Sequence, residues 1–113
     1  YATKGQRIKT INSVTLLGRI GSNPQKRGSF EHPVVIFSLA TSINLNSENG
    51  DVKTDWHRIC VFKPNLRESA YNYATKGQRI MVQGKILYGE IKDSNGATQN
   101  TCSIVAEDII YFK

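Results

Sequence analysis

Residues 54–62 read Thr-Asp-Trp-His-Arg-Ile-Cys-Val-Phe, and the alternation within this stretch decides the fold. Side chains of a β-strand point alternately to its two faces. The two faces are then Trp56, Arg58, Cys60 and Phe62 on one side and His57, Ile59 and Val61 on the other. The pattern predicts a strand that covers an apolar core with one face and exposes an aromatic and basic row on the other.

A helix is expected directly after this strand. Pro64 ends the strand, and Asn65 is the expected N-cap because Glu68 follows at the spacing of a capping box. The apolar residues that follow lie at helical spacing and form one stripe, which consists of Leu66, Ala70, Tyr73 and Ala74. Gly77 is expected to end the helix.

Further strands are predicted on either side of this strand and helix. Alternation predicts a strand over 14–20, and β-branched and aromatic residues predict one over 34–42. Strands over 79–88 and 101–112 follow the helix, with Gly84 as an expected bend and Asn95-Gly96 as a hairpin turn. Residues 21–33 and 44–53 are predicted to be loops. Three strands, a helix and two strands predict an all-β fold, the five-stranded Greek-key OB barrel with one helix between strands 3 and 4.

Length and charge limit the classes of function. The chain has 113 residues and a formal net charge of +6, which fits one domain with an anionic partner such as nucleic acid. No apolar stretch is long enough to span a membrane. His57 and Cys60 point to opposite faces of their strand, so no metal site is expected. The sequence also lacks a nucleophile elbow, convergent carboxylates and a phosphate-binding glycine loop, so we expect neither a cofactor nor an enzymatic activity.

The row that contains Trp56 is the strongest candidate for a binding site. Bases stack on aromatic rings and guanidinium groups meet phosphates, so the pattern is typical of single-stranded nucleic acid binding. The alternative is that Trp56, the single tryptophan, lies in the core. Two other classes remain open: an RNA-binding or primosome-type accessory OB module, and a protein-interaction module anchored by Trp56. Basic residues are expected around the row, namely Arg19, Lys26, Arg27, Lys53, Lys63, Arg67, Lys76, Lys85 and Lys92.

The first residues are predicted to lie outside the domain. We expect residues 1–10 to be an N-terminal extension that is disordered or was added artificially, and residues 11–113 to form a single OB-fold domain. The octapeptide Tyr-Ala-Thr-Lys-Gly-Gln-Arg-Ile occurs at 1–8 and again at 73–80, without a longer repeat. A chain that opens on Tyr1 is also expected to have lost residues upstream.

A series of short motifs resembles the single-stranded DNA-binding protein family in order and spacing, over about 12–112. These motifs are 16–19 (Leu-Leu-Gly-Arg), 21–24 (Gly-Ser-Asn-Pro), 37–41 (Phe-Ser-Leu-Ala-Thr), 54–58 (Thr-Asp-Trp-His-Arg), 61–62 (Val-Phe), 76–77 (Lys-Gly) and 82–85 (Val-Gln-Gly-Lys). The chain is most similar to the mitochondrial branch, because 62–67 (Phe-Lys-Pro-Asn-Leu-Arg) and 88–90 (Tyr-Gly-Glu) read as in animal mitochondrial members.

The resemblance implies an OB-fold homotetramer that wraps single-stranded DNA during mitochondrial replication, with a replicative polymerase and helicase as further partners. It places the protein in the matrix, at the nucleoid. It also implies that Trp56 and Phe62 stack on bases and that His57 supports subunit association.

The same resemblance implies a DNA path lined by Arg58, Lys63, Lys76 and Lys85, to which we add Arg19 and Lys53 as basic candidates. Two residues depart from the pattern of the family. Leu45 stands where many members have an aromatic residue, and Ile91 stands where bacterial members have a tryptophan. Both are expected to offer apolar contact to a base without full ring stacking.

Overall fold

The computed structural model describes residues 9–46, 48 and 50–112. Along these residues the elements are β1 (Val14–Ile20), β2 (Gln25–Gly28), β3 (Pro33–Asn46), β4 (Asp51–Val61), α1 (Pro64–Tyr73), β5 (Arg79–Lys92) and β6 (Thr98–Tyr111). The first copy of the octapeptide and most of the predicted extension 1–10 lie outside the described residues.

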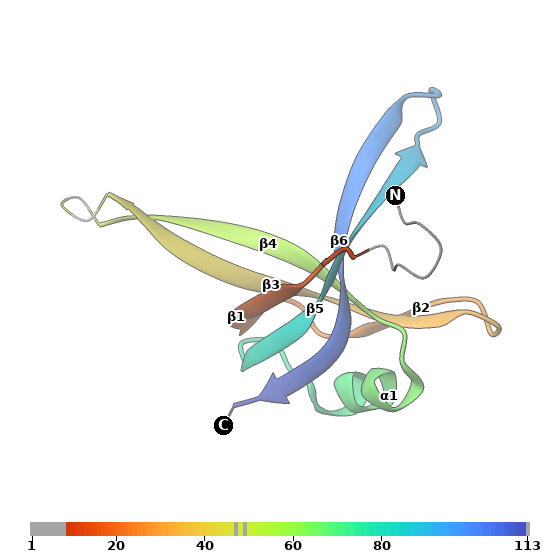
Figure 1. Ribbon diagram of the computed structural model, residues 1–113, viewed down its shortest axis with the longest axis horizontal. Coiled ribbons are helices and arrows are strands. Elements are labelled where there is room, and N and C mark those ends of the chain that lie inside the picture. Colours follow the sequence, from red (N-terminus) through yellow and green to blue (C-terminus); the bar gives the residue numbers. More distant parts are fainter. Residues whose placement is uncertain (1–8, 47, 49, 113) are drawn as a thin grey trace.

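The strands form one sheet that closes into a barrel (Figure 1). Neighbouring strands follow the order β1-β5-β6-β4-β3-β2, and β1 also pairs with β3, which closes the sheet. β4 and β6 run parallel and pair through Ile59 with Ile104 and through Cys60 with Val105. β1, β3, β4, β5 and β6 are the five predicted barrel strands, and α1 lies between the third and fourth of them. The predicted OB-fold class is therefore confirmed.

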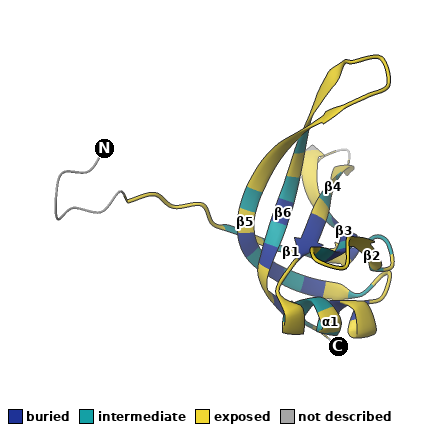
Figure 2. Ribbon diagram, turned by 90° about the vertical axis from the view of Figure 1, so that its right-hand side faces the viewer, coloured by how far each residue is buried: buried dark blue, intermediate teal, exposed yellow. Residues whose placement is uncertain are grey.

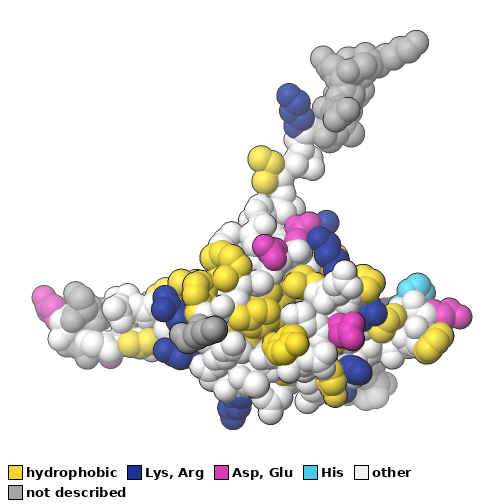
Figure 3. Space-filling model, turned by 90° about the horizontal axis from the view of Figure 1, so that it is seen from below, with side chains coloured by type: hydrophobic (Ala, Val, Ile, Leu, Met, Phe, Trp, Pro, Cys, Tyr) yellow, Lys and Arg dark blue, Asp and Glu magenta, His cyan; other side chains and the backbone are white. Residues whose placement is uncertain are grey.

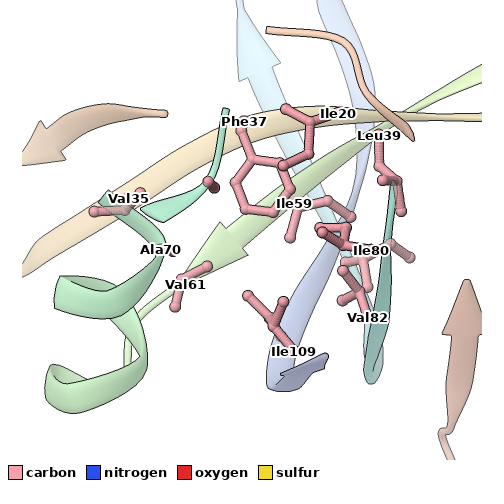
Figure 4. Packing of buried hydrophobic residues seen from close by; sticks show 13 residues of the cluster. Ile20, Val35, Phe37, Leu39, Ile59, Val61, Ala70, Ile80, Val82 and Ile109 are labelled. Atoms are coloured by element: carbon pink, nitrogen blue, oxygen red, sulfur yellow. The ribbon is translucent and has the colours of Figure 1, made fainter. Parts of the chain in front are cut away.

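The core lies inside the barrel and beneath α1 (Figure 4). Ile59 and Val61 of β4 are fully buried, as the alternation predicted. Buried side chains from the other barrel strands meet them, including Ile20, Val35, Phe37, Leu39, Ile80, Val82, Ile104 and Ile109. α1 contributes Ala70, its C-cap residue Ala74 is also buried, and Leu66 packs against this cluster. Burial of these apolar side chains is the main stabilising contribution to the barrel.

The ends of the helix differ from the prediction. The N-cap is Lys63 rather than Asn65, Pro64 occupies the first turn, and no side-chain hydrogen bond caps the helix. Proline suits this position because its φ is already helical and its missing N–H would have no partner there. α1 ends at Tyr73, so Gly77, with φ +90°, belongs to the turn before β5 rather than to the helix end. Tyr73 is 69% exposed and does not belong to the buried stripe.

Both predicted loops contain strand residues. Residues 25–28 form β2, which pairs with β3 through Gln25 opposite Ile36 and Arg27 opposite Val34. These polar residues lack an alternating pattern, so their strand conformation comes from hydrogen bonding to the β-branched start of β3. Residues 44–53 fall mostly within β3 and β4, which continue as a hairpin almost to its tip. β5 and β6 likewise extend beyond their predicted limits, to Lys92 and from Thr98.

Two predicted features of the β5–β6 hairpin are confirmed. The strand register shifts between Gln83 and Gly84, and a side chain at Gly84 would overlap the carbonyl group of Val105. The hairpin turn contains Gly96 at φ +82°, which glycine adopts without steric cost. Asp93 organises this turn, because its Oδ1 accepts hydrogen bonds of 2.9 Å from the backbone N–H groups of Asn95 and Ala97.

Two long hairpin arms leave the barrel in different directions (Figure 1). We call residues 41–55 the β3–β4 arm and residues 87–102 the β5–β6 arm. Where the structure describes them, neither arm contains a buried side chain, and Figure 2 shows exposed residues along the whole end of the β5–β6 arm. The arms therefore present their side chains to solvent or to a ligand.

Candidate nucleic-acid interface

The outer face of β4 carries the aromatic and basic row that the sequence predicts. Trp56 is 64% exposed, Arg58 is exposed, and Phe62, directly after the end of β4, is 45% exposed. Cys60, predicted on the same exposed face, is buried instead, because its small side chain lies between Ile36 and Val105 of the two neighbouring strands. His57 on the opposite face is half-buried. The alternative of a core tryptophan is wrong, since most of the indole surface is open to solvent. We call Trp56, Arg58 and Phe62 the Trp56 row.

The strand register adds two arginines to the surface that contains Trp56. Arg19 of β1 is opposite Ala40 of β3, and Ala40 is opposite Trp56. Cross-strand partners point to the same face, so Arg19 lies in line with the indole across a small alanine. Arg79 of β5 is opposite Arg19 and continues this line. Arg79 was not among the predicted site residues, because only the pairing of β5 with β1 places it there.

Lys85 also lies on this outer surface, on the far side of β6. Cys60, which follows Arg58 on the same face, is opposite Val105, and Val105 is opposite Lys85. Lys63 follows Phe62 and is exposed, and its Nζ donates a hydrogen bond of 3.3 Å to the carbonyl oxygen of Glu107. Both lysines therefore border the Trp56 row without belonging to β4.

Lys76 is linked to the row through the loop that follows β1. Its backbone N–H donates to Asn23 Oδ1 at 3.1 Å, and the N–H of Gly77 donates to the carbonyl oxygen of Ile20 at 2.7 Å. The exposed ring of Tyr73 comes just before this turn. Tyr73 is a candidate contact that the sequence pattern did not indicate, because helical spacing assigned it to the core stripe.

Three predicted residues are not brought to the row. Lys53 lies at odd spacing from Trp56 and therefore on the opposite face of β4, where its Nζ is 3.3 Å from Asp55 Oδ1. Leu45, 63% exposed, lies at an irregularity near the tip of the β3–β4 arm, and Ile91, 52% exposed, lies on the β5–β6 arm. Val52 shares the face of Trp56 and is 58% exposed, and its even spacing from Trp56 could have identified it.

His57 is held where the β3–β4 arm leaves the core. Its Nε2 lies 2.8 Å from Thr41 Oγ1, and its cross-strand partner Leu39 is fully buried. The histidine therefore joins the arm to the barrel. Its contact with another subunit stays a prediction.

A shallow depression of about 360 Å³ adjoins the Trp56 row. It is lined by Ser22, Gln25, Ile36, Phe37, Ser38, Trp56, His57 and Arg58. An open depression beside an exposed ring suits a planar base that lies on the surface. Across the described residues, no three acidic, histidine or cysteine side chains are grouped as metal ligands would be. No helix in the same part of the chain has the length and apolar character to cross a membrane.

The comparison with known proteins decides the family. Residues 11–112 match the Single-strand binding protein family. This chain belongs to that family. Its similarity to the "Single-stranded DNA-binding protein, mitochondrial" of Drosophila melanogaster is 58% identity over 107 residues, which cover 93% of this chain and 73% of the relative. The protein of the same name from Rattus norvegicus is 46% identical over 112 residues, covering 91% of this chain and 74% of the relative.

Solved structures agree with the fold. A chain of the Plasmodium falciparum SSB complex with ssDNA superposes with a TM-score of 0.84 at 30% identity, covering 96% of this chain and all of that one. The mitochondrial single-stranded DNA binding protein Rim1 of S. cerevisiae gives 0.74 at 23% identity, covering 93% and 98%, and so supports the fold alone. The resemblance seen in the sequence is thereby confirmed. Members of this family bind DNA without catalysing a reaction, in line with the expected absence of enzymatic activity.

Proposed function

We propose that this protein binds single-stranded DNA with little sequence preference in mitochondria and covers it during DNA replication. The observation that carries the proposal is the exposure of Trp56 beside Arg58 on the outer face of β4. An exposed indole beside a guanidinium group offers a base a ring to stack on and a neighbouring phosphate a positive charge. The mitochondrial location rests on the relatives, which are mitochondrial single-stranded DNA-binding proteins.

Binding uses two kinds of contact. Bases stack on Trp56 and Phe62, and each stacked base contributes roughly 1–3 kcal/mol. Arg58 meets the phosphate backbone next to the rings, and Arg19, Lys63, Lys76, Lys85 and Arg79 provide further positive charge around the row. Stacking accepts every base because every base has a π face, so the surface binds DNA without reading its sequence.

The two arms lengthen the contact. Leu45 and Ile91 are exposed on different arms and offer apolar surface to bases beyond the Trp56 row. The two arms leave the barrel in different directions (Figure 1). A DNA strand that follows both arms therefore wraps around the protein rather than binding end-on. Lys53, on the opposite face of its arm, contributes less than Arg58.

The fluorescence of Trp56 provides the test, because the chain has no other tryptophan. Titration with poly(dT) at several salt concentrations should quench the emission, and log affinity should fall linearly with log salt by about 0.7 for each phosphate neutralised. Duplex DNA should compete poorly because its bases are already stacked. Tighter binding of the matching RNA would favour the RNA-binding alternative, and binding of a protein partner without salt dependence would favour the interaction module.

We also propose that the protein is a homotetramer. β1 pairs with β5 along its length but with β3 only at Arg19 and Ile20, so within the described residues most of its second edge has no strand partner. A free strand edge is a template for pairing with another copy. An apolar row lies on the outer surface next to this edge of β1. In it, Leu17 is opposite Met81, and Met81 is opposite Ile110.

Figure 3 shows hydrophobic side chains gathered at the centre of the face seen from below. Sedimentation should give four times the chain mass of 12.6 kDa, and Leu17→Glu should lower it. A single-chain mass at micromolar concentration would contradict the tetramer. The same proposal places His57 at a contact between subunits. It also includes a replicative polymerase and a helicase as partners.

A further inference from the structure

Gly21 lies directly beneath the ring of Trp56. A Cβ atom at this position would overlap Trp56 Cζ3 and would lie 2.8 Å from Cε3 and 3.0 Å from Ser38 Oγ. Gly21 does not have a positive φ, so its backbone conformation is open to any residue. Glycine is therefore needed here for space against the indole rather than for a special turn.

The backbone around Gly21 is fixed from several sides. Its N–H donates to the carbonyl oxygen of Ser38 at 2.8 Å, and Ile20 beside it exchanges hydrogen bonds with Gln78 and Gly77. Ser22 Oγ accepts hydrogen bonds of 3.0 Å from the backbone N–H and from the hydroxyl group of Ser38. A methyl group at position 21 cannot be accommodated by retreat of the loop, so the indole ring has to move.

The contact supports Trp56 without burying it, because the ring remains 64% exposed. An exposed tryptophan on an unsupported strand would sample several rotamers and would lose that freedom on binding a base, which lowers the affinity. A ring that already rests on a fixed backbone avoids part of this loss.

We propose that Gly21 is a positioning residue for single-stranded DNA binding, which holds the Trp56 ring in its stacking orientation. The role rests on the proposed function of the Trp56 row and acts through the ring, without a contact of its own to DNA. Ser22 and Ser38 belong to the same support, since their hydrogen bonds fix the loop on which the ring lies.

The test is a double-mutant cycle with Gly21→Ala and Trp56→Ala. Gly21→Ala should weaken oligo(dT) binding by about 3- to 10-fold while leaving the salt slope unchanged, because no charge is removed. In the Trp56→Ala background the same change should have no further effect. An equal loss in both backgrounds would overturn the positioning role, because Gly21 would then act on DNA or on the fold directly.

Spectroscopy of the free protein gives an independent measurement. Gly21→Ala should lower the fluorescence anisotropy of Trp56 and shift its emission. Gly89→Ala is the matched control, because Gly89 also lacks a positive φ and an added Cβ there meets only Thr101 Oγ1, at 2.9 Å. This control should leave the emission of Trp56 unchanged. An unchanged anisotropy in Gly21→Ala would contradict the proposal.

Two outcomes separate the inference from the proposed function. If Trp56→Ala itself binds oligo(dT) normally, the Trp56 row is not the DNA surface. If Trp56→Ala weakens binding and Gly21→Ala does not, the positioning role alone is wrong. Should Gly21→Ala fail to fold, adding Trp56→Leu, whose shorter side chain does not reach the new methyl group, should restore folding, and failure to restore it would overturn the overlap argument.

Discussion

The base of the barrel and its two arms are made from the same strands, yet they differ in what their side chains do. β4 runs through both regions: Ile59 at the base is fully buried, whereas Val52 on the β3–β4 arm is 58% exposed. Backbone hydrogen bonds continue without interruption from one region to the other. Strand pairing therefore extends well beyond the core, and the part beyond it is free to carry binding residues without a packing constraint.

The largest expected effect contrasts these two regions directly. Ile59→Ala should lower the free energy of unfolding by about 2–5 kcal/mol, because it removes buried apolar surface and leaves a cavity. Val52→Ala should change it by no more than about 0.5 kcal/mol, because no core surrounds the side chain. Urea unfolding at one fixed protein concentration measures both. A comparable loss for Val52→Ala would show that the arm is packed in solution.

The second prediction concerns the two faces of β4. Trp56→Ala should weaken oligo(dT) binding by about 1–3 kcal/mol while the unfolding free energy stays nearly constant, because stacking is lost and the core is untouched. The control is Tyr71→Ala, an exposed aromatic residue of α1 whose ring is covered by Lys26 Nζ at 4.3 Å. Its DNA affinity should match the unsubstituted protein. Unfolding of Trp56→Ala with normal binding of the folded fraction would disprove the assignment.

The third prediction separates ring from charge within the Trp56 row. Arg58→Ala should make the slope of log affinity against log salt shallower by about 0.7 for each phosphate that the guanidinium group had neutralised. Trp56→Ala should lower affinity at every salt concentration and leave the slope nearly constant, since stacking releases no counterions. Fluorescent oligo(dT) titrations from low to high salt measure both variants. Equal flattening by the two would show that ring and guanidinium do not have separate roles.

The smallest effect is expected on the back of the β3–β4 arm. Lys53→Ala should weaken oligo(dT) binding less than Arg58→Ala, because Lys53 faces away from Trp56 and already pairs with Asp55 at 3.3 Å. The loss of an exposed ion pair should alter stability by no more than about 0.5 kcal/mol. Parallel salt titrations of the two variants provide the comparison. If Lys53→Ala equals Arg58→Ala, the DNA also follows the back of the arm.

Local patterns predicted the strands best where one face is buried. The alternation over 54–62 correctly placed Ile59 and Val61 inside and Trp56 outside, but it wrongly placed the buried Cys60 on the exposed face. Local pattern fails where no core lies beneath the strand, so β2 and the arm residues 44–53 are predicted as loops. The polar residues there form strands only because they pair with a neighbouring strand. For the same reason Lys53 was grouped with residues on the opposite face.

The helix shows the complementary limitation. Its existence, its buried residue Ala70 and the buried C-cap residue Ala74 follow from spacing along the chain. The start of the helix does not follow from the sequence pattern. Pro64 lies in the first turn and no side chain caps the helix, so Asn65 lies inside the helix. Tyr73 has helical spacing with the stripe, yet the helix ends at this residue and its ring turns to solvent.

By itself, the sequence determined the residues that alternate between core and surface on each central strand, and hence that an indole and a guanidinium group share an open face. This information is local, because it depends only on the two-residue period of a strand. The tertiary structure decided which distant residues join that face. Arg19 and Arg79 line up with Trp56, Lys85 reaches the same surface, and Gly21 supports the indole, because each position depends on how strands remote in the sequence are paired and on the loop that closes the barrel.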